Sequence, residues 1–291
     1  MNTQKNLATV LGTAAAVLCL GSATGQVAQA GTLHQGWNYA IDSFNDGYNS
    51  GIIGANSEYE FYGMAAREDA DNLYIAFNSN LGLDGAASSH ASDGHIGWGD
   101  LFLNFSGDNF STAQSSGDLF GIRFAENSDS NVGLGLYSGV TARSVAQQNS
   151  GFQNLNQHKS YVANKGGTAT LADLAQTDPY LQRTGNWTIL NSINSGNKIG
   201  DVNIIEDVSG LGLDFGNFGA VGDRTFAISM DKSLLPTGDF IASVFAECGN
   251  DGMALTGNVA NASVPEPTTT IGLALFGLTF LGSSRRLRRQ R

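Results

Sequence analysis

The stretch WGDLFLNF, residues 98–105, is the clearest strand signal in the chain, and it decides the fold class. Leu101, Leu103 and Phe105 alternate with Asp100, Phe102 and Asn104. A repeat of two residues is the period of a β-strand, in which successive side chains point to opposite faces of a sheet. The turn residues SGDN follow directly at 106–109. The stretch therefore predicts a β-strand with one face in a core.

The same alternation recurs on both sides of this strand. Upstream, residues 58–66 and 72–79 are two alternating runs joined by a polar turn, which predicts a hairpin. Downstream, strands are expected at residues 119–125, 132–140, 202–208, 224–230 and 240–247. We therefore expect an all-β chain with about nine to eleven strands, and a jelly-roll-type β-sandwich fits that number and spacing best.

Residues 141–200 interrupt the strand pattern. Gln, Asn, Ser and Gly dominate there, and apolar residues are sparse. We expect a long polar loop region with a short helix near Thr170, where the spacing resembles a capping box, and a strand over 187–190. A loop of this length inside a domain is usually functional or mobile.

The N-terminus is typical of an export signal. Lys5 precedes an apolar run over residues 7–20, and Ala28 and Ala30 flank one residue in an A-x-A cleavage pattern. Signal peptidase and the secretion machinery are therefore expected partners. The expected organisation of the chain is a signal peptide over 1–30, a β-sandwich surface domain over 31–257, a linker over 258–263 and a C-terminal segment over 264–291.

The C-terminal segment has three parts in a fixed order. Pro265, Glu266 and Pro267 form an extended element, because two prolines one residue apart block a helix. Residues 268–284 could then form a helix of roughly 25 Å, slightly short of a hydrocarbon core of about 30 Å. The last part is a run of arginines that would stay in the cytoplasm: Arg285, Arg286, Arg288, Arg289 and Arg291.

This ordered tail resembles the PEP-CTERM sorting signal of Gram-negative bacteria. The resemblance implies that an exosortase, an inner-membrane protease, recognises the Pro-Glu-Pro element and removes the tail. The precursor would then sit transiently in the inner membrane, and the product would reach the cell surface or the extracellular polysaccharide. A plain C-terminal anchor that is never cleaved is the alternative interpretation.

Four phrases within the domain also resemble one group of exosortase-dependent surface proteins. They lie at residues 37–43, 59–65, 98–102 and 247–252. The resemblance implies a surface or matrix protein, for example of a biofilm, and it supplies no catalytic residues.

Net charge limits the classes of molecule that the domain can bind, and cysteine content limits how the domain can be stabilised. The two end segments hold six of the 15 basic and one of the 26 acidic residues, so the chain between them carries a net charge of −16. Such a surface repels nucleic acid and attracts cations such as calcium. Cys248 is the only cysteine outside the signal peptide, so no internal disulfide is expected. Calcium is therefore a possible stabilising ion, although the sequence assigns no ligand set.

The sequence contains no catalytic motif of the H-E-x-x-H, C-x-x-C or G-x-S-x-G type. His90, Asp93 and His95 share a loop and could hold a metal, but a solvated loop is the simpler interpretation. Cys248 could act as a nucleophile only beside a base, whereas a buried thiol is the simpler interpretation.

Trp98 and Asp100 are the candidate ligand-binding residues. The stretch over 98–105, which follows the strand over 73–77, is similar to β-sandwich carbohydrate-binding modules in which a Trp-x-x-Asp begins a strand and an acidic site binds calcium or sugar. A flat indole stacks on a sugar, and a carboxylate takes hydroxyls or a hard cation. The alternative is that Trp98 closes the core and Asp100 caps a turn.

These observations favour a non-enzymatic, exported surface protein that is held in extracellular polysaccharide through sugar or calcium contacts. The alternative is a secreted, glycan-active hydrolase with an unrecognised acidic active site. Such a hydrolase needs two carboxylates that converge in an open cleft.

Overall fold

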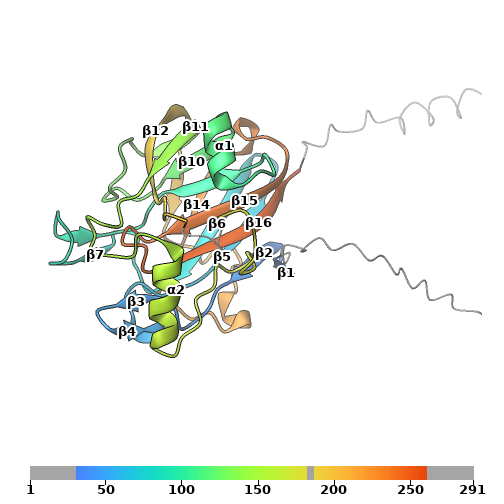
Figure 1. The fold of residues 1–291 in the computed structure, drawn as a ribbon. Coiled ribbons are helices and arrows are strands. Elements are labelled where there is room, and N and C mark those ends of the chain that lie inside the picture. Colours follow the sequence, from blue (N-terminus) through green and yellow to red (C-terminus); the bar gives the residue numbers. More distant parts are fainter. Residues whose placement is uncertain (1–30, 182–186, 261–291) are drawn as a thin grey trace, which may run out of the picture.

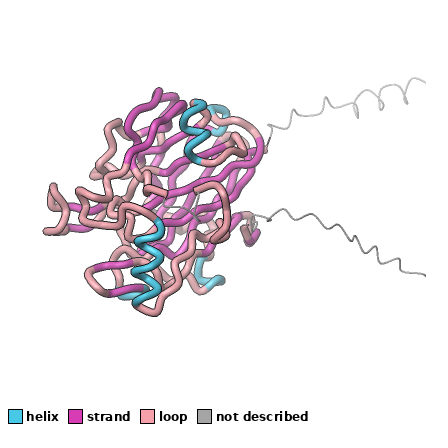
Figure 2. The backbone as a smooth tube through the Cα atoms, viewed as in Figure 1, coloured by secondary structure: helices cyan, strands magenta, loops and turns pink. Residues whose placement is uncertain are grey.

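The computed structural model describes residues 31–181 and 187–260. Two six-stranded antiparallel sheets face each other across a shared apolar core (Figures 1 and 2). The strand order is β1-β2-β5-β6-β14-β13 in the first sheet and β12-β11-β10-β9-β15-β16 in the second. The arrangement is that of a β-sandwich.

The first sheet consists of β1 (Thr32–His34), β2 (Trp37–Ile41), β5 (Phe61–Glu68), β6 (Asn72–Ser79), β13 (Asn203–Ile205) and β14 (Arg224–Asp231). The second consists of β9 (Leu101–Asn104), β10 (Leu119–Arg123), β11 (Gly135–Arg143), β12 (Ser192–Gly200), β15 (Gly238–Phe245) and β16 (Gly252–Val259). Two short hairpins pair β3 (Tyr48–Asn49) with β4 (Ile52–Ile53) and β7 (Ala86–Ala87) with β8 (His95–Ile96). The helices are α1 (Phe110–Ser116), α2 (Leu155–Asn164) and the short 3-10 turns η1 (Gly54–Asn56), η2 (Phe215–Phe218) and η3 (Lys232–Leu234).

The central core lies where the alternating patterns place it. Ile75 and Phe77 of β6 and Leu101 and Leu103 of β9 all pack into the core between the sheets. Burial of such side chains contributes about 1.5 to 3 kcal/mol each. The hairpin predicted from residues 58–66 and 72–79 is confirmed as β5 and β6.

The outer face of each sheet is covered as well. Phe110 of α1, together with Leu155, Leu171 and Trp187 from the polar region, packs on the outer side of the second sheet. The segment around Phe215 covers the outer side of the first sheet. Of the region over 141–200, residues 144–181 and 187–191 therefore form a covering layer with a few apolar anchors and contain α2, whereas β12 belongs to the second sheet.

The prediction of a short helix near Thr170 is wrong. Residues 170–173 form no helix, because Ala172 has a φ of 46°, which lies outside the right-handed helical region. The N–H of Thr170 donates to Asp46 (2.7 Å), and the N–H of Ala172 donates to Asp42 (2.8 Å). These hydrogen bonds hold the segment against the loop that follows β2.

The remaining predictions about organisation have different outcomes. The all-β prediction is confirmed at the level of antiparallel sheets, while the jelly-roll connectivity stays a prediction. Strand β16 runs to Val259, two residues beyond the expected end of the domain at Gly257. Within the described ranges, no helix is long and apolar enough to cross a membrane. The predicted signal peptide over 1–30 and the C-terminal segment over 264–291, with its processing and arginine residues, lie outside the described residues.

Candidate metal centre and surface sites

The structure places Trp98 in the middle of the core. Its side chain is fully buried, and its ring stacks on that of Phe61 with centroids 4.2 Å apart. The indole N–H donates to the carbonyl of Gly82 (2.9 Å). Because no face of the ring is exposed, a sugar cannot stack on Trp98. Trp98 is therefore a core residue, as the alternative interpretation of the sequence proposed.

Asp100 is likewise a structural residue. It is 1% exposed, and its Oδ2 accepts a hydrogen bond from the N–H of Ile193 (2.5 Å) at the edge strand β12. Burial raises the pKa of Asp100 to about 6, while the charges of Arg123 and Arg143 act to lower it. Asp100 thus fastens β12 to β9 and offers nothing to a ligand in solvent.

The other residues singled out from the sequence do not form a site. His90 and Asp93 are exposed, and the ring of His95 hydrogen-bonds the carbonyl of Asp84 (2.6 Å). No metal-ligand group among residues 31–181 and 187–260 includes these three side chains. Cys248 is fully buried, and burial raises the pKa of its thiol to about 12, so it is not an activated nucleophile.

Three aspartates from distant parts of the chain come together at one end of the sandwich. Asp42 and Asp46 follow β2, and Asp251 lies in the turn between β15 and β16. One carboxylate oxygen from each lies within 4.8 Å of the others. Calcium–oxygen distances are about 2.3 to 2.6 Å, so two oxygens on one ion lie at most about 5 Å apart. The spacing of the three aspartates therefore fits a single cation.

Glu60, just before β5, joins this group. It is fully buried, and its Oε2 accepts a hydrogen bond from the N–H of Gly47 (2.8 Å). Its negative charge contributes to the raised pKa of both Asp46 and Asp251. A Cβ atom at Gly47 would lie 2.4 Å from the Cα of Glu60, so only glycine allows this approach. We call the four side chains the carboxylate cluster: Asp42, Asp46, Glu60 and Asp251.

Backbone N–H groups hold the carboxylate cluster in place. Phe61 donates its N–H to Oδ2 of Asp251 (2.7 Å), in addition to the bonds to Asp42 and Asp46 from residues 170–172. Two other oxygens, Oδ1 of Asp46 and Oε1 of Glu60, have no hydrogen-bond partner among the residues that the structure describes. Each of these carboxylates thus accepts a backbone N–H on one oxygen, while its second oxygen has no partner at hydrogen-bond geometry.

The electrostatics of the cluster are those of crowded, buried acids. Burial first, and then the charges of neighbouring carboxylates, raise the pKa of Asp46 to about 9. Burial is also the main cause that raises the pKa of Glu60 to about 8 and that of Asp251 well above its usual value. No ion pair between described residues includes Asp46, Glu60 or Asp251. These buried carboxylates must therefore be neutralised, either by protonation or by a bound cation.

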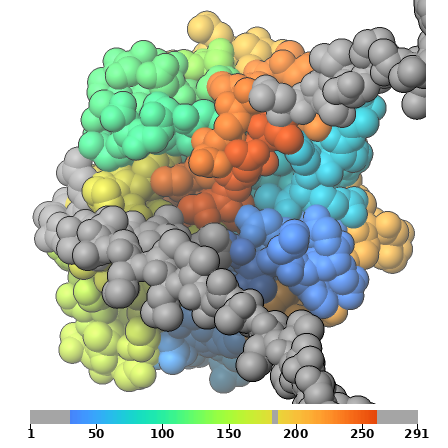
Figure 3. Space-filling view, turned by 90° about the vertical axis from the view of Figure 1, so that its right-hand side faces the viewer, coloured from blue at the N-terminus to red at the C-terminus, as the bar shows by residue number. Residues whose placement is uncertain are grey.

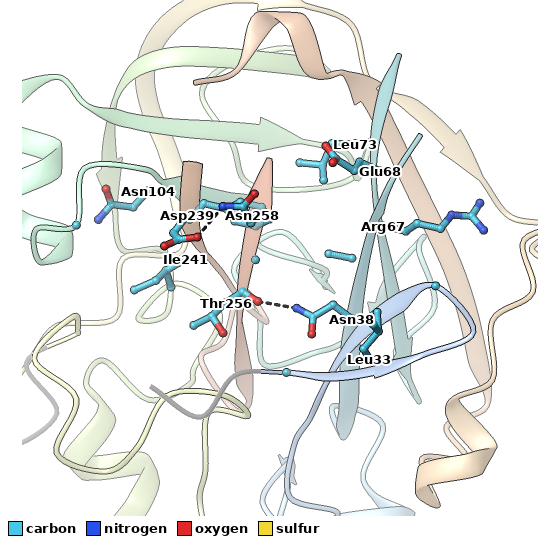
Figure 4. Close-up of a pocket in the computed structure, with 16 residues that line it drawn as sticks. Leu33, Asn38, Arg67, Glu68, Leu73, Asn104, Asp239, Ile241, Thr256 and Asn258 are labelled. Carbon is cyan, nitrogen blue, oxygen red and sulfur yellow. Dashed lines mark hydrogen bonds between the residues drawn. The ribbon is translucent and has the colours of Figure 1, made fainter. Parts of the chain in front are cut away.

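A large hollow lies elsewhere, between the edges of the two sheets (Figure 4). It measures about 680 Å³, its lining is mainly apolar, and several of its polar groups are paired with one another. Asn38 donates to the carbonyl of Thr256 (2.7 Å), and Asn258 donates to Asp239 (2.7 Å). Gly31 lines this hollow, and the N–H of Ala260 donates to Glu68 on its wall. Both ends of the described domain therefore lie beside it.

Helix α2 carries a shallow, amide-rich surface that the sequence did not reveal. Tyr161 is 46% exposed, and its ring packs against those of Tyr48 (5.0 Å) and Phe152 (5.4 Å). The hollow around it measures about 460 Å³. We call its lining the α2 face: Asn154, Asn156, Gln157, Ser160, Tyr161 and Asn164. An exposed ring beside amide donors and acceptors can contact a sugar through stacking and hydrogen bonds.

A comparison with known families identifies the C-terminal tail. Residues 263–289 match the PEP-CTERM protein-sorting motif. The chain is a PEP-CTERM protein. The motif implies an exosortase as the processing partner, and export with membrane anchoring before cleavage. No curated protein and no solved structure matches this PEP-CTERM chain.

Proposed function

We propose that this PEP-CTERM protein is a non-enzymatic surface protein that an exosortase delivers to the cell surface or extracellular matrix, where it contacts polysaccharide. The sorting motif itself suggests an exosortase-processed, exported surface protein. The observation that carries the polysaccharide contact is the α2 face, with one exposed tyrosine among amide side chains.

The α2 face has the physical properties of a sugar-binding surface. Tyr48 and Phe152 hold the ring of Tyr161 from the protein side, so little side-chain freedom is lost when a sugar stacks on it. The surrounding amides can both donate to and accept from sugar hydroxyls. The shallow shape suits a chain molecule that passes over the surface rather than a small ligand that is enclosed.

The position of the two chain ends supports attachment from one side. The N-terminal strands and the hairpin β15–β16 meet on the side that Figure 3 views. Both ends of the domain leave from there, so a membrane anchor on the precursor would hold the domain by this side. Helix α2 lies away from the two chain ends (Figure 1).

The burial of the converging carboxylates supports binding over hydrolysis. A glycosidase places its two carboxyl groups in a cleft that the substrate enters. The aspartates that converge here are at most 6% exposed, so a polysaccharide cannot reach them.

The test is retention of the full chain on the extracellular polysaccharide of the producing cells, together with an assay for new reducing ends. We expect retention of the wild type, loss of most retention in Tyr161→Ala, and no reducing ends. Phe44→Ala is the matched control, because Phe44 is also an exposed aromatic residue but lies outside the α2 face. Unchanged retention in Tyr161→Ala would refute the binding surface, and new reducing ends would support the hydrolase.

Processing is tested separately by replacing Pro265, Glu266 and Pro267 with alanine. The variant should remain in the inner membrane with its C-terminus intact, as mass spectrometry of cell fractions would show. Normal release of this variant would contradict processing by an exosortase.

A further inference from the structure

We propose that the carboxylate cluster binds one calcium ion and that this ion fastens the two sheets together at one end of the sandwich. The first observation is geometric. Oxygens of Asp42, Asp46 and Asp251 lie within 4.8 Å of one another, which is the spread expected around one calcium ion.

A second observation points to a ligand. Asp46 and Glu60 are both fully buried, and each keeps one carboxylate oxygen without a hydrogen-bond partner among the described residues. A buried polar atom with no partner destabilises a fold. A cation among the three aspartates would place positive charge beside these buried carboxylates and would offset the repulsion between them.

The donor set selects the class of ion. The cluster offers only carboxylate oxygens, and no His or Cys belongs to the group. Oxygen ligands favour hard cations, and Mg²⁺ requires a near-ideal octahedron and usually keeps several waters. Calcium tolerates irregular, water-poor coordination. The choice of calcium also rests on the export in the proposed function, because extracellular modules bind calcium at concentrations of about 0.1 to 1 mM.

The position of the ligands gives the ion a structural role. Asp42 and Asp46 follow strand β2 of the first sheet, whereas Asp251 belongs to the β15–β16 turn of the second. Asp42 and Asp46 also hold the segment over 170–172 through its N–H groups. His158 of α2 hydrogen-bonds the carbonyl of Asp46 (2.8 Å). One ion thus connects both sheets, the covering segment and the helix that carries the α2 face.

The test is thermal unfolding of the full chain in detergent, without polysaccharide, in calcium and in chelator at equal ionic strength. At a calcium concentration about a hundredfold above the dissociation constant, the Tm of the wild type should rise by about 5 to 10 °C. Asp46→Asn should lose this rise, and its Tm in chelator should be no lower than that of the wild type. The amide can still accept the N–H of Thr170, and one negative charge is removed from the cluster.

Matched controls separate this site from general effects of charge and from the proposed polysaccharide contact. Asp173→Asn also neutralises a buried carboxylate, but outside the cluster, and Tyr161→Ala changes only the α2 face. Both should keep the full rise in Tm. Equilibrium dialysis against calcium in excess of the dissociation constant should find one more bound calcium per wild-type chain than per Asp46→Asn chain, a readout that does not depend on the stability of the variant. No rise in the wild type, an equal rise in Asp46→Asn, or an equal rise with Mg²⁺ would overturn the assignment.

Discussion

Two buried acidic regions of this domain differ in what faces them. Asp100 is a single carboxylate, and the charges of Arg123 and Arg143 act to lower its pKa. In the carboxylate cluster, the neighbouring charges that act on Asp46, Glu60 and Asp251 come from other carboxylates and raise their pKa. The comparison teaches that burial of an acid is not in itself a sign of function. The informative feature is whether the protein supplies the opposite charge.

The largest expected change in unfolding free energy concerns Trp98, which lies two residues before Asp100. Trp98→Ala should destabilise the domain by about 3 to 5 kcal/mol, because it leaves a cavity among the stacked rings of the core. The loss should be the same in calcium and in chelator, as urea unfolding in both buffers would show. A loss below about 1 kcal/mol, or one found only in chelator, would contradict the view that this end of β9 needs no ion.

The next largest change in stability is expected for a variant that distorts the carboxylate cluster without changing its charge. Gly47→Ala should cost about 2 to 3 kcal/mol, because the new Cβ would lie 2.4 Å from the Cα of Glu60 and neither backbone can yield easily. It should also reduce the rise in Tm that calcium produces. Gly210→Ala is the control, since a Cβ atom there meets nothing within 4 Å, and it should change stability by less than about 0.5 kcal/mol. If the two variants had the same unfolding free energy and the same rise in Tm with calcium, Gly47 would not be needed to position the carboxylate cluster.

The smallest effect concerns Asp173, a buried acid with no carboxylate beside it. It accepts both the N–H and the hydroxyl of Thr256, and burial raises its pKa to about 6. A raised folded-state pKa means that stability falls as pH rises from the unfolded pKa of about 3.9 to the folded value. Asp173→Asn should therefore stabilise the domain by about 1 to 2 kcal/mol above pH 6 and by nothing below pH 4.

The measurement is the difference in unfolding free energy between wild type and Asp173→Asn from pH 4 to pH 8. Because both proteins share the cluster, its own titration cancels in the difference. A gain that stays constant across this range would show that Asp173 does not retain its proton on folding.

Local patterns explain which parts of the fold were predictable. Strands β6, β9 and β14 carry alternating apolar residues, which a sequence reports directly. Strand β12 has the sequence SINSGNKIG, whose small and polar residues conceal a strand paired with β11. Helix α2 was missed for a similar reason, because it buries few apolar residues.

The candidate sites were less predictable because they depend on contacts across the chain. Asp251 lies in a turn and Glu60 directly precedes a strand, and neither position by itself indicates a ligand. Only the pairing of β2 with β5, and the packing of the β15–β16 turn against them, brings these side chains together. For Trp98 the difficulty was different. A tryptophan can stack on a sugar or pack in a core, and only its burial in the structure decides between the two.

The most direct test of the central claim is an anomalous diffraction experiment on crystals of the processed protein grown in calcium, with data collected at long wavelength. The account predicts one anomalous peak at about 2.3 to 2.6 Å from oxygens of Asp42, Asp46 and Asp251, with Glu60 beside them, and no peak near Asp100. A cluster without a peak, with its carboxylates hydrogen-bonded to one another through shared protons, would contradict the account.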